Sequence, residues 1–178
     1  MPSSTPQHHL VLVGLMGAGK TTTGEECARR LGRAFVDTDE IVAAASGQSV
    51  EELFETEGEA GFRARERIAL ADACAAPEPL VIACGGGAVL DAGNRATMRA
   101  SGLVVWLRAS PAQLAHRVGD GGGRPLLAGA PSVDTLERLA ALRAPAYEAA
   151  AHVVVETDGL APEAVVGRVL EELDRCVA

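Results

Sequence analysis

A glycine-rich segment near the start of the chain has the residue spacing of a phosphate-binding loop. Residues 14–21 read GLMGAGKT, which fits the pattern Gly-x-x-x-x-Gly-Lys-Thr. Glycines at these places let backbone N–H groups turn inward around phosphate oxygens, and the helix that follows points its positive dipole end at them. In such loops the lysine, here Lys20, bridges the terminal phosphates, and the hydroxyl of Thr21 ligates Mg²⁺. The residues expected to contact ATP or GTP are Gly17, Ala18, Gly19, Lys20, Thr21 and Thr22.

Lys20 is the only lysine in the chain. The other fifteen of the 16 basic residues are arginines. A surface position accepts either residue, because either supplies a positive charge. Between the loop and the phosphates, however, a compact ammonium on a thin stem fits where a planar guanidinium does not. The position of the lone lysine therefore supports the loop independently of its glycines.

Two aspartates are candidates for the acceptor side of the site. Asp37 and Asp39 follow the apolar segment 34–36 and stand two residues apart. In extended geometry both side chains point to the same side, at the carboxyl end of the sheet, where ligands of open α/β folds bind. One carboxylate could hold a water of the metal and the other an acceptor hydroxyl. The competing interpretation is that one aspartate only caps a helix that begins near Ile41.

A pair of opposite charges lies in the helical segment around residues 62–67. Arg63 and Glu66 share a helix face, so Glu66 could hold the guanidinium in place for a carboxylate ligand. A purely structural salt bridge is the competing interpretation. Arg143, four residues before Tyr147 on another helix, is the remaining candidate cation, although a lone helical arginine usually faces solvent.

Three consecutive glycines follow the apolar segment 80–83. At the carboxyl end of a strand they permit a close approach of the backbone to a ligand. A bare turn would seldom need three. We therefore expect the acceptor site to include Gly85, Gly86 and Gly87.

A second glycine-rich run, residues 119–123, is too flexible in composition for a regular helix or strand. A surface turn would explain it, but Arg124 follows directly and places a cation on the segment. We therefore expect residues 119–130 to form a mobile lid.

Five short apolar segments alternate with helical patterns along the chain. This alternation predicts one α/β domain over residues 1–178, with a five-stranded parallel sheet between two layers of helices. Helix signals include a capping box at Ser49 and Glu52 and helix starts at Pro111 and Pro162. The expected strands are residues 10–13, 34–36, 80–83, 103–107 and 153–155, and the clearest helices are residues 20–31 and 135–150.

Composition narrows the classes of function. The net charge is −8 and aromatic residues make up 3% of the chain, which argues against nucleic acid as a partner, since that needs basic surface and often stacking rings. No early segment combines a basic start with a long apolar run, so we expect neither export nor a membrane segment. The four cysteines form no Cys-x-x-Cys pair, which indicates a reducing cytoplasm without a zinc site or disulfide framework.

Taken together, the motifs resemble those of the shikimate kinase family, in order and near-family spacing over nearly the whole chain. The resemblance implies a P-loop kinase fold, a monomer, Mg²⁺ as cofactor and ATP as co-substrate. It also implies transfer of the γ-phosphoryl group to the 3-hydroxyl of shikimate, a step in making chorismate and the aromatic amino acids. The motifs are GxxGAGKTTxG from Gly14, FxDTD ending at Asp39, FRxxE from Phe62, GGG from Gly85, RPLL from Arg124 and RxxxYE from Arg143.

The resemblance assigns roles on the acceptor side. Asp39 would bind the ring hydroxyls and act as base or orienter for the attacking oxygen. Arg63 and Arg143 would bind the carboxylate, and Gly86 would contact the substrate through its backbone.

On the nucleotide side, the resemblance implies that Thr21 ligates Mg²⁺ directly and that Asp37 supports Mg²⁺ from the outer coordination shell. Arg117 matches the position that stacks on adenine, and Arg124 would swing in with the lid to neutralise charge on the transferring phosphoryl group. Leu160 departs from the family, because relatives often carry an arginine near this place, close to the nucleotide.

Two other functions compete with this interpretation. One is another small-molecule kinase, such as a gluconate kinase or a nucleoside monophosphate kinase, which would share the nucleotide side. The other is a nucleotide-dependent switch that hydrolyses ATP without an acceptor. The carboxylate-binding pair Arg63 and Arg143 argues against a nucleotide acceptor, and together with Asp39 it would have no purpose in a switch.

Overall fold

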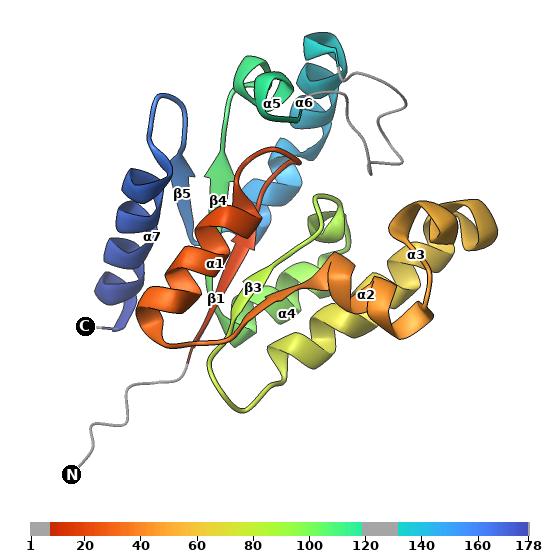
Figure 1. Ribbon diagram of the computed structural model, residues 1–178, viewed down its shortest axis with the longest axis horizontal. Helices are drawn as coiled ribbons and strands as arrows, with labels where there is room; N and C mark the ends of the chain where they lie inside the picture. The colour runs from red at the N-terminus through yellow and green to blue at the C-terminus, as the bar shows by residue number, and fades with distance from the viewer. Residues whose placement is uncertain (1–7, 119–131, 178) are drawn as a thin grey trace.

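A computed structural model describes residues 8–118 and 132–177 of the chain. Its centre is a parallel sheet with the strand order β2-β3-β1-β4-β5 (Figure 1). The middle strand β1 is buried at all 5 residues, as expected of an apolar strand covered on both faces. The five predicted strands are confirmed, each within one residue at either end. They are β1 (His9–Val13), β2 (Phe35–Asp37), β3 (Val81–Ala83), β4 (Gly102–Arg108) and β5 (Val153–Glu156).

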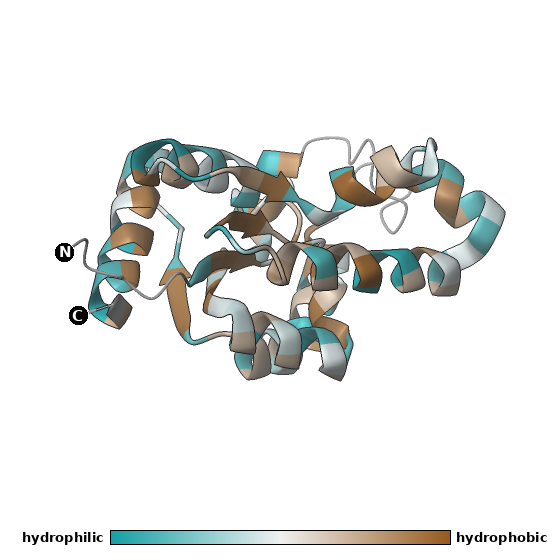
Figure 2. Ribbon diagram, turned by 90° about the horizontal axis from the view of Figure 1, so that it is seen from below, coloured by the Kyte–Doolittle hydropathy of each residue, from teal (hydrophilic) through white to brown (hydrophobic). Residues whose placement is uncertain are grey.

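Helices cover both faces of the sheet, so the predicted three-layer α/β/α architecture is confirmed. On one face, α1 (Lys20–Leu31) packs against α7 (Pro162–Val177). On the other, α4 (Ala92–Ser101) and α6 (Val133–Ala150) pack against each other and against β4. Figure 2 shows the apolar strands enclosed between the helices. A further helix, α5 (Pro111–Val118), packs beside α6.

Capping side chains set where the helices begin. The predicted capping box is confirmed, because Ser49 Oγ accepts a hydrogen bond from the Glu52 N–H and a Glu52 carboxylate oxygen accepts one from the Ser49 N–H. At the start of α2 (Thr38–Ser46), Asp37 Oδ1 accepts from the Asp39 N–H at 2.9 Å. Both caps lie in the segment that carries the acceptor-side candidates.

The segment 39–75 folds into α2 and α3 (Val50–Cys74), which extend beyond the sheet on the side of the edge strand β2 (Figure 1). α3 is bent at Gly58, whose φ of 73° and ψ of −179° are not helical. A side chain at such a backbone conformation would be strained, so the bend depends on glycine. After β3, a short 3-10 helix, η1 (Ala88–Leu90), leads into α4.

Several sequence predictions concern features beyond the helices and strands. The predicted lid, residues 119–130 with Arg124, lies outside the described residues. No helix within residues 8–118 and 132–177 has both the length and the apolar character needed to cross a membrane. The four cysteines carry free thiols.

Candidate active site

The parallel sheet brings the predicted site residues to one edge. Because neighbouring strands run the same way, the segments that follow β1, β2 and β3 leave the sheet at its carboxyl end. Two adjoining cavities open there. Their shared wall consists of Thr21, Asp37, Asp39, Gly85 and Gly86.

The first cavity, which we call the nucleotide cavity, has a volume of about 490 Å³ and follows the glycine-rich loop. Every residue that the sequence assigns to the nucleotide lies on its wall, except Arg124, which is outside the described residues. The residues on the wall are Gly17, Ala18, Gly19, Lys20, Thr21, Thr22 and Arg117.

The glycine-rich loop has the backbone form that its sequence predicts. Gly17 and Gly19 have φ angles of 80° and 93°, in the left-handed region that side chains disfavour. Gly19 also precedes α1, whose first N–H groups and positive dipole end form an anion-binding terminus. The Lys20 ammonium donates to the carbonyls of Gly14 at 2.8 Å and Leu15 at 3.1 Å. These bonds hold a positive charge over the loop, beside the place expected for phosphates.

Arg117 of α5 lines the same cavity from the side of β5. Its guanidinium donates to Thr157 Oγ1 at 3.1 Å, to the Thr157 carbonyl at 3.3 Å and to the Gly17 carbonyl at 3.4 Å. Sequence reasoning does not find Thr157, because its place beside Arg117 depends on the pairing of β5 with β4. Leu160 and Pro162 add apolar surface to this wall. An arginine and apolar groups therefore lie together on this wall, a combination that can pack against a planar ring.

The second cavity, which we call the acceptor cavity, has a volume of about 280 Å³. One part of its wall is charged: α3 supplies Arg63 and Glu66, α6 supplies Arg143, and α2 supplies Asp39 and Glu40. Guanidinium groups and carboxylates on one wall can bind a small molecule that carries both an anionic group and hydroxyls. The apolar part of the wall consists of Met16, Val50, Phe54 and Phe62.

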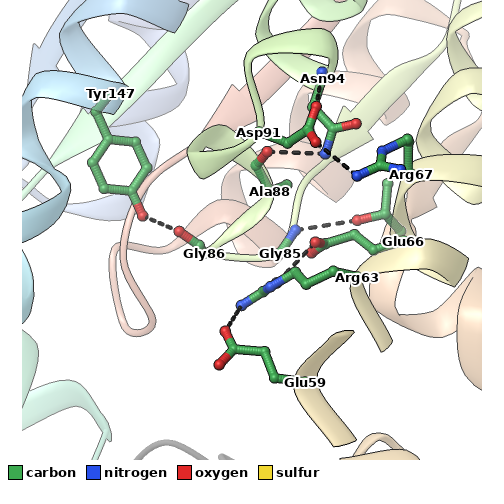
Figure 3. Close-up of polar contacts among 11 residues, drawn as sticks. Glu59, Arg63, Glu66, Arg67, Gly85, Gly86, Ala88, Asp91, Asn94 and Tyr147 are labelled. Atoms are coloured by element: carbon green, nitrogen blue, oxygen red, sulfur yellow. Dashed lines mark hydrogen bonds and ion pairs between the residues drawn. The ribbon is translucent and has the colours of Figure 1, made fainter. Parts of the chain in front are cut away.

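Arg63 and Glu66 form the ion pair that helix spacing predicts. Arg63 donates to Glu66 Oε2 at 2.8 Å and to Glu59 at 3.4 Å (Figure 3). Glu66 is fully buried, and burial raises the pKa of its carboxyl to about 7, while Arg63 opposes the shift. Its other oxygen, Oε1, has no hydrogen-bond partner among the described residues. Glu66 therefore holds the Arg63 guanidinium in place on the wall of the acceptor cavity.

Arg143 differs from the usual lone helical arginine, because it is only 3% exposed. α6 carries it into the core without a break at Pro145, as predicted. Within the described part of the chain, Arg143 Nε has no hydrogen-bond partner. A buried guanidinium with an unused donor is costly unless an anion supplies the acceptor. Arg143 is therefore a candidate anion-binding group.

Tyr147 lies one turn after Arg143 and connects α6 to the glycine run. Its hydroxyl donates to the Gly86 carbonyl at 2.6 Å (Figure 3), and its ring stacks on Trp106 with centroids 5.2 Å apart. Burial raises the pKa of the Tyr147 phenol, so the hydroxyl keeps its proton and donates. The backbone of Gly86 is thereby held next to Arg143.

The three glycines leave room for the charged side chains of the site. A Cβ on Gly85 would lie 2.6 Å from both Asp39 Oδ1 and Glu66 Oε1, and one on Gly87 would overlap the Arg63 guanidinium. From sequence alone, the glycines are expected to let a ligand approach the backbone. The geometry adds a second reason, because a side chain at Gly85 or Gly87 would displace Asp39, Glu66 or Arg63.

The expectation that Asp37 and Asp39 both extend from a strand is wrong. Asp37 ends β2, but Asp39 lies in the first turn of α2, which begins at Thr38 rather than near Ile41 because Asp37 caps it. Both carboxylates nevertheless line both cavities. Sequence reasoning does not single out Thr38, which is fully buried and whose hydroxyl accepts from the Gly85 N–H at 3.1 Å. This bond ties α2 to the glycine run.

Known proteins resemble this chain in sequence and in fold. Residues 16–174 match the family profile described as shikimate kinase. A shikimate kinase of Symbiobacterium thermophilum is 48% identical over 167 residues, which cover 93% of this chain and 95% of the relative. One of Pseudomonas aeruginosa is 46% identical over 165 residues, with coverage of 93% and 95%. The solved structure of shikimate kinase from Acinetobacter baumannii in complex with shikimate has a TM-score of 0.91 at 35% identity, and the match covers 97% of this chain and 96% of that one.

Proposed function

The chain belongs to the shikimate kinase family, and from this premise we propose that it transfers the γ-phosphoryl group of ATP to the 3-hydroxyl of shikimate. One observation carries the proposal. Two guanidinium groups, those of Arg63 and the buried Arg143, line an acceptor cavity that shares Thr21 and Asp39 with the nucleotide cavity. An anionic acceptor held by both arginines would lie beside the terminal phosphate of ATP. The product, shikimate 3-phosphate, serves the synthesis of chorismate and the aromatic amino acids.

On the acceptor side, Arg63 and Arg143 bind the carboxylate of shikimate with charge-assisted hydrogen bonds. Asp39, on the shared wall, accepts a hydrogen bond from the 3-hydroxyl and orients or deprotonates the attacking oxygen. The backbone of Gly86, which Tyr147 holds in place, contacts the ring. Gly85 and Gly87 complete this wall. Catalysis on this side is therefore mostly positioning.

On the phosphate side, Lys20 bridges the terminal phosphates and the N-terminus of α1 stabilises their charge. Arg117 stacks on adenine, which its place on the nucleotide cavity supports. We assign Arg124 the neutralisation of charge on the transferring phosphoryl group. The segment 119–130 would act as a lid whose closure keeps water from taking that group.

Two side chains of the shared wall fit a magnesium ion. The Thr21 hydroxyl and the Asp37 carboxylate are oxygen donors, which hard cations prefer. Mg²⁺ usually takes one or two protein oxygens and completes its shell with water and phosphate oxygens. We assign Thr21 as a direct ligand and Asp37 as a partner of metal-bound water. When bound, Mg²⁺ neutralises charge on the β- and γ-phosphates.

We also propose that the enzyme is a cytoplasmic monomer. The location is supported by four free thiols, since a reducing compartment keeps cysteines in this form. The monomer is the state of association that membership of the shikimate kinase family implies.

A coupled assay of ADP release tests the proposed reaction. The protein is given ATP and Mg²⁺ with shikimate, gluconate or nucleoside monophosphates in parallel. We expect release with shikimate, because a ring with a carboxylate matches both the apolar and the charged wall of the acceptor cavity. An equal rate of ADP release with and without shikimate would contradict the proposal. Release with gluconate would favour the competing kinase, and release without any acceptor would favour a nucleotide-dependent switch.

A further inference from the structure

The bend in α3 brings together residues that a straight helix would keep apart. Residues eight apart are separated by about 12 Å along a helix axis, because each residue rises about 1.5 Å. Across the bend, however, Arg65 donates to both carboxylate oxygens of Glu57, at 2.7 and 2.9 Å. Phe54 and Phe62, also eight apart, have ring centroids 4.8 Å apart. The first half of α3 therefore approaches the second.

Two glycines make this approach possible. Gly58, at the bend, has φ 73° and ψ −179°, a conformation that is essentially confined to glycine. Gly61 leaves room for Glu57, because a Cβ on Gly61 would lie 2.5 Å from the Glu57 Cβ. The Glu57 side chain thus packs on the backbone of Gly61 and reaches Arg65.

The bend also decides where the apolar wall of the acceptor cavity lies. Val50 and Phe54 come from the first half of α3, whereas Phe62, Arg63 and Glu66 come from the second. Two parts of the same cavity wall are therefore joined through the bend. A change of the bend angle would move Val50 and Phe54 relative to the Arg63 guanidinium, which is assigned to the acceptor carboxylate.

We propose that the Glu57–Arg65 ion pair, which we call the brace, positions the acceptor cavity by fixing the bend at Gly58. The inference rests on the proposed function for the identity of the acceptor. Among the described residues that line the two cavities, neither Glu57 nor Arg65 occurs, so the brace acts through Val50 and Phe54 and not by contact with substrate. The side chains of Arg65 and Glu57 are 41% and 34% exposed, so solvent screens the pair and its effect is moderate.

Charge reversal with rescue tests the brace. Glu57→Arg and Arg65→Glu each place like charges across the bend, whereas the double variant restores an ion pair of the opposite sense. We expect each single variant to raise the KM for shikimate about threefold to tenfold and the KM for ATP less than about twofold. Amide hydrogen exchange of residues 50–57 should become faster in both single variants. The double variant should recover most of both effects.

Arg29→Glu is the matched control, because Arg29 forms an exposed ion pair with Glu26 on α1, far along the chain from the bend. It should leave the KM for shikimate and the exchange of residues 50–57 unchanged. Wild-type behaviour of both single variants, or a double variant without recovery, would overturn the brace. Hydrogen exchange is measured without substrate. It therefore tests the brace even if the ADP-release assay of the wild-type protein shows that shikimate is not the acceptor.

Discussion

The nucleotide cavity and the acceptor cavity share a wall but are built by different means. The phosphate end of the nucleotide cavity is formed by one continuous segment, residues 17–23, whose backbone conformation and helix terminus favour an anion. The charged wall of the acceptor cavity consists of side chains that α2, α3 and α6 bring together around the glycine run after β3. Use of ATP is therefore a local property of this chain, whereas the choice of acceptor depends on how distant helices pack.

The largest effect should follow from a substitution in the glycine-rich loop of the nucleotide cavity. Lys20→Met removes the ammonium that the Gly14 and Leu15 carbonyls hold over the loop. We expect kcat to fall on the order of 10³-fold, because charge on the transferring phosphoryl group loses its cation. Shikimate affinity, measured by calorimetry, should change less than about twofold. A parallel collapse of shikimate affinity would show that the two cavities do not act separately.

Arg124→Ala should give the next largest effect. With the cation of the proposed lid removed, we expect kcat to fall about 10²-fold. Calorimetry should find shikimate binding nearly intact. Arg138→Ala, at an exposed position of α6, is the control and should leave kcat unchanged. Loss of shikimate binding in Arg124→Ala would place Arg124 in the acceptor cavity instead.

Arg63→Ala tests the acceptor cavity, whose charged wall depends on how the helices pack. We expect the KM for shikimate to rise about 30-fold or more with little change in the KM for ATP, because one ligand loses a charged partner. Arg67→Ala, one turn further along α3, removes an exposed arginine that pairs with Asp91 and should leave both constants near wild type. Equal effects of Arg63→Ala on both substrates would mean that Arg63 is structural.

Glu66→Gln tests the burial of the carboxylate that holds Arg63 on the wall of the acceptor cavity. Burial raises the pKa of the Glu66 carboxyl from 4.5 to about 7. The folded protein then holds this proton more tightly than the unfolded chain, so the contribution of Glu66 to stability is highest below pH 4.5, declines as the pH rises to about 7, and is constant above. The free energy of unfolding of the wild type minus that of Glu66→Gln should fall by about 3 kcal/mol over this range.

Denaturant unfolding at a series of pH values provides the measurement. The comparison of the two proteins cancels the other titrating groups. A difference that rises with pH would show that pairing with Arg63 outweighs the burial of Glu66.

Most of the fold follows from local patterns. Each strand is a short apolar run, and the helix starts at Ser49, Pro111 and Pro162 depend on capping or proline geometry within a few residues. The loop around Lys20 is recognisable for the same reason, since its function resides in consecutive residues. Local sequence is sufficient wherever the relevant contacts are local.

The acceptor side could be predicted only as a set of candidates. The spacing of Arg63 and Glu66 predicts their pairing, but the burial of Arg143 depends on how α6 packs on the core. Thr38 and Thr157 gain their roles from contacts with residues 47 and 40 positions away, which no local pattern encodes. Asp39 lies in a helix and not in the extended segment that its spacing predicts, because Asp37, two residues before it, caps α2.

The bend at Gly58 is an intermediate case. A glycine within a helical pattern signals a kink or a close approach. The signal does not say which residues the kink brings together, because that depends on the angle of the bend. The Glu57–Arg65 pair is therefore visible only in the structure.

The central claim is that Arg63 and Arg143 recognise the carboxylate of the acceptor. The most direct measurement is kcat/KM of the unchanged protein for shikimate and for its methyl ester, which keeps the ring and hydroxyls but lacks the charge. We predict that the ester loses about 10²-fold or more in kcat/KM while the KM for ATP stays the same. Equal kcat/KM values for the acid and the ester would contradict the account.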